Sequence, residues 1–218
     1  MKLVTIIDYG SGNIKSVFNA FNLLSRRKEN LKVLVSSNKS DISNSTHLVL
    51  PGVGSFKSCI DGLKRSNLIE TISRKVNSEK TPFLGICVGM QMLASKGFEN
   101  GEFSGLNWIQ GNVKKISRSQ KNLKIPHMGW NNLKIIKESP FIKKLKSKIS
   151  DSEISAYFVH SYNFHTDKKE NKVMSTNYGQ EITAMVSKKN IIGVQFHPEK
   201  SHKFGLIFLE TFIENEEF

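Results

Sequence analysis

Cysteine, proline and acidic residues are all scarce in this chain of 218 residues. It has two cysteines, Cys59 and Cys87, and five prolines. Two cysteines cannot build a disulfide framework, and they fit a reducing cytoplasm, where we expect the protein to be located. No run of about 18 apolar residues occurs, which excludes a membrane-spanning helix. Because no linker or internal repeat interrupts the chain, we predict one domain over residues 1–218.

Ligand patterns for metals and nucleotides are missing as well. No histidine, cysteine or carboxylate cluster has metal-ligand spacing, so no metal and no cofactor are expected. The glycine-rich turn at residues 8–13 follows an apolar run, but Lys15 stands where a dinucleotide fingerprint has its third glycine. A tight turn between strand and helix is the favoured interpretation of this stretch.

Negative charge is the rarer sign, with 19 acidic against 32 basic residues and a net charge of +13. The lysines are scattered, and no basic stripe interleaved with aromatic residues occurs, so we expect no nucleic-acid partner. A generally lysine-rich composition explains the charge, and a basic docking face for a protein partner is the alternative.

The first hundred residues repeat a strand–helix pattern four times. Strands are predicted at residues 3–7, 31–35, 47–54 (with Pro51 ending the ladder) and 82–86, with a helix at 59–76 and another beginning at Met90 and running to Ala94. This pattern favours a parallel sheet covered on both faces by helices. After Gly105, short alternating segments predict an additional antiparallel β portion, with residues 126–130 in a loop and a final helix at 203–213. The predicted fold is an α/β three-layer sandwich with a mostly parallel central sheet.

Cys87 lies between Gly85 and Gly89, where an apolar strand turns into a helix. A nucleophile on such a turn is the elbow geometry of α/β-hydrolase-type enzymes, with cysteine in place of serine. The helix N-terminus favours the thiolate. A buried, unreactive cysteine is the alternative, and a base elsewhere in the chain must decide between them.

Residues 193–199 supply that base, because a buried strand ends at His197 and Pro198 stops it. Residues i and i+2 of an extended chain point the same way, so Glu199 can approach the His197 ring. A carboxylate on one imidazole nitrogen leaves the other free to take a proton from sulfur. The loop Pro51–Gly54 ends another strand, and its backbone N–H groups can hold an anion or simply form a turn.

These residues resemble the class I glutamine amidotransferases, through the stretches Gly85–Gln91 and Gly193–Glu199. Three further stretches, at residues 7–13, 126–131 and 157–162, resemble the glutaminase subunits of imidazole glycerol phosphate synthase. The resemblance implies that L-glutamine is the substrate, that Cys87 is the nucleophile, and that His197 and Glu199 complete the triad. It also implies an oxyanion hole at Gly52, Val53 and Val88 and a glutamine pocket at Gln91, Glu99, His160, Ser161 and Tyr162.

The same resemblance implies a partner, a (β/α)₈-barrel synthase subunit that receives the ammonia. Asn13, Trp130, Tyr157 and Lys200 are then expected at the interface or the ammonia gate. Three alternatives stay open: a paralogous glutaminase for amidination of a surface-glycan sugar, a stand-alone cysteine γ-glutamyl hydrolase, and a binding module without activity. No bulk property of the sequence separates the histidine-pathway glutaminase from the glycan glutaminase.

Overall fold

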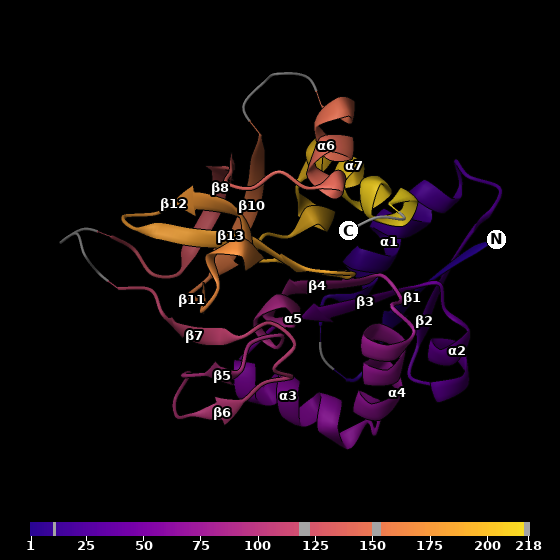
Figure 1. Ribbon diagram of the computed structural model, residues 1–218, viewed down its shortest axis with the longest axis horizontal. Coiled ribbons are helices and arrows are strands. Elements are labelled where there is room, and N and C mark those ends of the chain that lie inside the picture. The colour runs from indigo at the N-terminus through magenta and orange to yellow at the C-terminus, as the bar shows by residue number, and fades with distance from the viewer. Residues whose placement is uncertain (11, 118–122, 150–153, 216–218) are drawn as a thin grey trace.

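A sheet of eight strands runs through the computed structural model, which describes residues 1–10, 12–117, 123–149 and 154–215 (Figure 1). The strand order is β2-β1-β3-β4-β14-β13-β12-β9. The strands are β1 (Lys2–Ile7), β2 (Leu31–Ser36), β3 (His47–Gly52), β4 (Phe83–Cys87), β9 (Lys134–Ile135), β12 (Lys172–Asn177), β13 (Glu181–Lys188) and β14 (Ile191–Val194). Ser11, in the glycine-rich turn, lies outside the described residues.

The first five strands of this order pair in parallel, and the remaining pairs are antiparallel. Every residue of β3, β4 and β14 is buried, as expected for strands covered on both faces. In parallel sheets, ligands bind beyond the carboxyl ends of the strands. The register pairs Gly52 of β3 with Cys87 of β4. The loop that begins at Pro51 and the turn at Cys87 therefore lie side by side at the carboxyl ends of their strands.

Helices cover both faces of the sheet and complete three layers (Figure 1). One face carries α1 (Ile14–Ser25), α6 (Pro140–Lys148) and α7 (His202–Glu214), and the other carries α2 (Lys39–Asn44), α3 (Phe56–Arg65), α4 (Ile69–Ser73) and α5 (Val88–Gln91). The prediction of an α/β three-layer sandwich with a mostly parallel sheet is confirmed. None of the helices within the described residues has the length and apolar character needed to cross a bilayer.

Two smaller sheets, mostly antiparallel, lie beside the main sheet. One pairs β8 (His127–Asn132) with β10 (Ser155–His160). The other has the order β11-β7-β5-β6, with β11 (Tyr162–Thr166), β7 (Gly111–Lys115), β5 (Lys96–Gly97) and β6 (Phe103–Ser104). Within it β5 and β7 are parallel. These strands form the additional β portion predicted for the second half.

The prediction of one continuous helix over residues 59–76 is wrong, because two helices occupy this segment. Helix α3 begins earlier, at Phe56, with the Ser55 side chain accepting from Ser58 N, and ends at Arg65. Asn67 then takes a left-handed backbone angle of φ 55°, which a continuous helix cannot contain. Helix α4 follows and runs into a π-helical turn at Arg74–Ser78.

The helix after Cys87 is also shorter than predicted, because α5 ends at Gln91 rather than Ala94. The carbonyls of residues 92–94 accept hydrogen bonds from the N–H groups of Leu106, Asn107 and Trp108. Beyond Gln91 the N–H groups of Leu93 and Ala94 bond to the carbonyls of Met90 and Gln91, a tighter turn that ends the α-helix, and the segment following Gly105 pairs with the carbonyls left free.

The loop predicted at residues 126–130 is mostly strand. Residues 127–132 form β8, which pairs with β10 from His127↔His160 to Asn132↔Ser155. The prediction failed because Gly129 interrupts the apolar alternation from which a strand is recognised. His127 and His160, expected in loops, are buried partners within this ribbon.

Candidate active site at the carboxyl ends of β3, β4 and β14

Cys87 occupies the sharp turn between β4 and α5. Its backbone angles are φ 56° and ψ −113°, a conformation that non-glycine residues rarely adopt. Strain of this kind is held only where surrounding packing fixes it, as it is at nucleophile elbows. The elbow predicted from the sequence is therefore present in the backbone geometry.

Three glycines allow the elbow to pack against the neighbouring strand. A Cβ atom on Gly89 would lie 1.9 Å from the Leu50 carbonyl oxygen of β3. A Cβ on Gly52 would lie 2.6 Å from the Gly89 nitrogen, and one on Gly85 would lie 2.6 Å from the Gly89 oxygen. Any side chain at these positions would push α5 off the sheet and move the sulfur.

His197 and Glu199 meet directly behind the elbow. Nδ1 of His197 lies 2.8 Å from Oε1 of Glu199, and the side chains are 3% and 0% exposed. Asn13 Nδ2 lies 3.5 Å from the same carboxylate oxygen. Asn13, predicted at the partner interface, is thus placed beside the Glu199 carboxylate.

The His197 ring interacts with both Cys87 and Glu199. Burial lowers the pKa of His197, but hydrogen bonding and charge from Cys87 and Glu199 outweigh burial and raise that pKa to about 10. A raised pKa means that the imidazole binds a proton readily while it lies between the sulfur and the carboxylate. The arrangement can therefore move a proton from thiol to imidazole.

A cavity of about 360 Å³ opens at the sulfur. It brings together almost every residue predicted for catalysis, oxyanion binding or the glutamine pocket: Val53, Cys87, Val88, Gln91, Glu99, His160, Ser161, Tyr162 and His197. Lys200 also lines it, together with Pro126 and Val159, which the sequence analysis did not select. Gly52 lies behind the cavity, where it contacts the elbow.

Glu99 supplies a carboxylate to this cavity from the loop between β5 and β6. Its Oε2 accepts a hydrogen bond of 2.6 Å from the Phe56 N–H at the first turn of α3. Burial, together with the charge of Glu99, raises the pKa of the Tyr162 hydroxyl. The carboxylate is thus fixed on one side by α3 and faces the cavity near Tyr162.

His160 points its imidazole away from the sulfur and into the β8–β10 ribbon. His160 Nδ1 lies 2.8 Å from the Tyr162 carbonyl oxygen, and Nε2 lies 3.0 Å from Nδ1 of His127. Burial lowers the pKa of His160 to about 3 and that of His127 to about 4. Both rings are neutral at physiological pH, and His160 reaches the cavity from the edge of its strand.

Gln195 is a buried residue of the site that the sequence analysis did not single out. Its side chain is fully buried, and Nε2 lies 3.7 Å from the Cys87 sulfur. A signal was available, because a glutamine in an otherwise apolar strand, two residues before His197, lies on the same side as that histidine.

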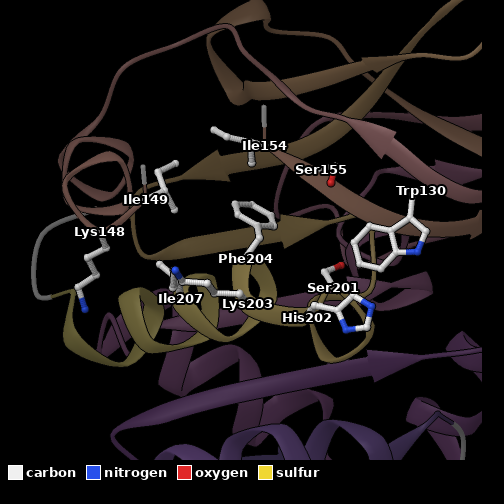
Figure 2. A pocket seen from close by; sticks show the side chains of 10 residues that line it. All are labelled: Trp130, Lys148, Ile149, Ile154, Ser155, Ser201, His202, Lys203, Phe204 and Ile207. Carbon is white, nitrogen blue, oxygen red and sulfur yellow. The ribbon is translucent and has the colours of Figure 1, made fainter. Parts of the chain in front are cut away.

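Three of the predicted interface residues form an exposed group beside the triad. Trp130 is 47% exposed, its ring centroid lies 6.2 Å from that of Tyr157, and Lys200 Nζ lies 5.8 Å from the centre of the Tyr157 ring. Trp130 also stacks on His202 at 4.8 Å, at one end of a second cavity of about 300 Å³ between β8, β10 and α7 (Figure 2). Met128, two residues before Trp130, is 61% exposed.

Comparison with known proteins places this geometry in a family. The family described as glutamine amidotransferase class-I matches residues 5–214. The chain is 47% identical over 211 residues to the imidazole glycerol phosphate synthase subunit HisH of Pelagibacter ubique, covering 96% of this chain and 98% of the relative. It is 44% identical to subunit HisH 2 of Methanococcus maripaludis, covering 97% and 99%.

Solved structures agree on the fold. A crystal structure described as a glutamine amidotransferase has a TM-score of 0.69 at 15% identity, covering 96% of this chain and 98% of that one. A glutamine amidotransferase from Thermotoga maritima has a TM-score of 0.59 at 18% identity, covering 97% and 82%. The chain belongs to the class-I glutamine amidotransferase family and, within it, to the HisH subunits of imidazole glycerol phosphate synthase.

Proposed function

We propose that this protein is the glutaminase subunit of an imidazole glycerol phosphate synthase. It hydrolyses L-glutamine to glutamate and ammonia, and the ammonia serves a synthase subunit that makes imidazole glycerol phosphate and AICAR in histidine biosynthesis. The observation that carries the proposal is the cavity at Cys87, where the His197–Glu199 pair and the Glu99 carboxylate converge. The names of the relatives support the choice of synthase.

The first half of the reaction forms a thioester. Cys87 gives its thiol proton to Nε2 of His197, and the thiolate attacks the side-chain amide carbon of glutamine. Backbone N–H groups of Val88 and of the Gly52–Val53 loop hold the oxyanion that develops. His197 then passes the proton to the amide nitrogen, the C–N bond breaks, and ammonia leaves.

The second half returns the enzyme to its starting state. Neutral His197 takes a proton from water, and the resulting hydroxide attacks the thioester carbon. The C–S bond breaks to release glutamate, and the sulfur again shares a proton with His197. Glu199 holds Nδ1 throughout, which keeps Nε2 directed toward the sulfur.

The rest of the cavity recognises the amino-acid end of glutamine. The Glu99 carboxylate pairs with the α-ammonium, and one of its oxygens is already oriented by Phe56 N–H. The described bonds of Gln91 both use Nε2, which leaves its Oε1 for the same ammonium. Ser161 and Tyr162 line the same cavity, and His160 contributes mainly backbone there.

The ammonia acceptor is a (β/α)₈-barrel synthase subunit in this proposal. Free ammonia is mostly ammonium at neutral pH and a poor nucleophile, so direct transfer benefits the synthase. Trp130, Tyr157 and Lys200 form the docking and gating surface beside the triad. Asn13 connects the glycine-rich turn to Glu199, and we assign it to the gate as well.

Replacing the nucleophile tests the proposal. We expect Cys87→Ala to abolish glutamine-dependent synthesis in the complex with the synthase subunit, while synthesis from added ammonium salts persists because docking is unchanged. Cys59→Ala is the comparison, since Cys59 does not line the cavity; its Sγ lies 3.3 Å from the Val53 carbonyl oxygen, so this variant should lower glutaminase activity only in part, through the loop, and keep turnover. Glutamine hydrolysis by Cys87→Ala would remove this cysteine from the mechanism.

The assay also separates the competing functions. A glutaminase for surface-glycan amidination would fail to support imidazole glycerol phosphate synthesis with its natural partner. A stand-alone γ-glutamyl hydrolase would cleave γ-glutamyl peptides without a partner. A binding module would show no turnover in any of these assays. The names of the similar relatives favour the histidine pathway.

We further infer that residues 1–218 form a single domain. The family match runs from residue 5 to residue 214, and one continuous apolar core extends from Val4 to Ile213. A single cooperative unfolding transition, seen equally by tryptophan fluorescence and circular dichroism, is expected.

A further inference from the structure

We propose that Gln195 is a further catalytic residue, which donates a hydrogen bond from its side-chain amide to the Cys87 sulfur. Its orientation is fixed by a chain of bonds through Gln91 to the Tyr162 backbone carbonyl. The assignment rests on the proposed glutaminase function for its role in turnover, but the hydrogen bond itself can be tested without glutamine.

The chain of contacts is continuous. Gln91 Nε2 lies 3.4 Å from the Tyr162 carbonyl oxygen and 2.9 Å from Gln195 Oε1. Gln195 Nε2 lies 3.7 Å from Cys87 Sγ, a normal length for a nitrogen donor to sulfur. Both amides are buried, Gln91 at 3% and Gln195 at 0% exposure.

The direction of each bond follows from the chemistry of its ends. The Tyr162 carbonyl oxygen can only accept, so the Gln91 amide must present its NH₂ group there. That NH₂ group also faces Gln195, so Gln195 must present its carbonyl oxygen in return. The other end of the Gln195 amide, its NH₂ group, then faces the sulfur. One backbone carbonyl thus sets the polarity of two side chains.

The burial of the Gln195 amide also indicates that it donates to the Cys87 sulfur. Burying an amide among the apolar side chains just after β14 is costly unless its polar atoms are satisfied. Filling space behind Cys87 would need only an apolar side chain of similar size. A donor at this position instead stabilises negative charge on the sulfur, which the proposed reaction creates when the thiol loses its proton and again when the thioester breaks.

Gln91 connects this bond to the substrate pocket. It lines the cavity next to Glu99, so a bound glutamine would contact one end of the Gln91 amide while the other end holds Gln195. We infer that filling the pocket tightens the bonds that orient the donor toward the sulfur.

Alkylation by iodoacetamide tests the hydrogen bond directly, because the thiolate displaces iodide and no glutamine turnover is involved. The rate at Cys87, followed by mass spectrometry of the modified peptide, is measured from pH 5 to 10. We expect Gln195→Leu to alkylate about ten-fold more slowly at low pH and to reach the wild-type rate at high pH. A loss that disappears at high pH reports a destabilised thiolate rather than blocked access.

Gln195→Glu is the sharper variant. It keeps the shape of the side chain and can still accept from Gln91, but it replaces the donor facing the sulfur with an oxygen. We expect it to slow alkylation at low pH more than Gln195→Leu does, by roughly a hundred-fold relative to wild type. Because a carboxylate also repels the thiolate whatever the native amide does, a neutral variant decides the assignment. Gln195→Met has similar volume but no donor and no charge, and a wild-type alkylation profile in Gln195→Met would overturn the proposal.

Asn190→Leu is the matched control for the loss of a buried amide. Asn190 donates to the Val76 and Thr81 carbonyls at the far end of β14, away from the cavity. It should lower the melting temperature without moving the pH profile of alkylation. Circular dichroism at each pH shows whether a Gln195 variant is folded; if Gln195→Leu is not, the decision rests on Gln195→Met.

Glutaminase assays with the synthase subunit complete the test. The Gln195 variants should lose kcat more than they raise KM, since the donor acts on charge that develops during reaction. Unchanged alkylation profiles in an active, Cys87-dependent glutaminase would refute the Gln195 assignment alone. Shifted profiles in a protein with no glutaminase activity would support the hydrogen bond and refute the proposed function.

Discussion

Glu99 illustrates how one side chain can serve both the fold and the pocket. One carboxylate oxygen caps the start of α3 through Phe56 N–H, and the residue lines the cavity beside Tyr162. Its position depends on the loop between β5 and β6, which is held by pairing of Lys96 with Ser104. A charge fixed in this way needs little rearrangement when an ammonium group arrives.

Removing the charge of Glu99 should weaken substrate binding more than catalysis. Glu99→Gln keeps the shape and an oxygen for Phe56 N–H, but it loses the attraction to the α-ammonium of glutamine. We expect KM for glutamine to rise about ten- to a hundred-fold with a smaller change in kcat, measured in the complex with the synthase subunit.

Glu102→Gln is the matched control, because this exposed carboxylate three residues away pairs only with Lys96 among the described contacts. Exposed pairs of this kind contribute little to stability or function. An unchanged KM in Glu99→Gln would mean that another group binds the ammonium.

Contacts between residues that are close in the sequence could be predicted, whereas contacts between distant residues could not. The pair His197 and Glu199 could be predicted because extended residues i and i+2 face the same way, and the structure brings them to 2.8 Å. Gln195 could not be oriented from the sequence, since its bond to Gln91 joins residues that are 104 positions apart. The roles assigned to the predicted site residues stay predictions until the variants are measured.

At the scale of elements, the contact between α5 and β3 determines where the sulfur lies. Gly89 allows the helix to touch the Leu50 carbonyl, and Gly52 lets β3 approach the helix in return. Helix propensity alone would favour alanine at Gly89 by about 1 kcal/mol. A Cβ atom at 1.9 Å from backbone oxygen reverses that preference, because neither backbone can move without shifting its element.

Gly89→Ala should therefore destabilise the protein by about 2 kcal/mol or more and reduce glutaminase activity sharply. Urea unfolding measures the first effect and glutamine hydrolysis the second. Gly10→Ala is the comparison, since Gly10 has φ 80° and a Cβ added there would have no atom within 4 Å, so only about 1 kcal/mol of backbone strain is expected. Equal stability of Gly89→Ala and wild type would refute the packing argument.

The order and type of most elements could be predicted from hydrophobic periodicity, while their ends could not. Helix α5 stops at Gln91, where the next N–H groups shift to i→i−3 bonds, and the carbonyls of residues 92–94 pair with the segment that follows Gly105, a contact that local sequence does not encode. Strand β8 was missed for a related reason: its partner β10 begins more than twenty residues later, and pairing rather than propensity forms it.

At the scale of the whole molecule, histidines and charge pairs make folding sensitive to pH. Burial lowers the pKa of His160 to about 3 and that of His127 to about 4, and burial with the nearby Lys2 lowers that of His47 to about 4. His197 shifts the other way, to about 10. Glu214 is partly exposed, and although its partial burial acts to raise its pKa, hydrogen bonds and charge from Lys148 and Lys28 lower that pKa to about 2.

The direction of each pKa shift determines the pH range over which the free energy of unfolding changes. A histidine with a lowered folded pKa binds its proton more readily when unfolded, so stability falls as pH drops below 6.5 toward 4. The stabilisation from His197 is fully present below pH 6.5 and is lost only as pH rises toward 10. The contribution of Glu214 is lost below about pH 4.5. Between pH 6.5 and 5, the three buried neutral histidines therefore dominate.

We expect the free energy of unfolding to fall by about 1.5 kcal/mol per buried neutral histidine between pH 6.5 and 5. Urea titrations at half-unit steps measure the slope. His127→Gln removes one such ring and should make the slope shallower, whereas His202→Gln changes an exposed ring and should leave it as in wild type. A slope that is flat in wild type, or unchanged in His127→Gln, would show that these buried rings do not control acid stability.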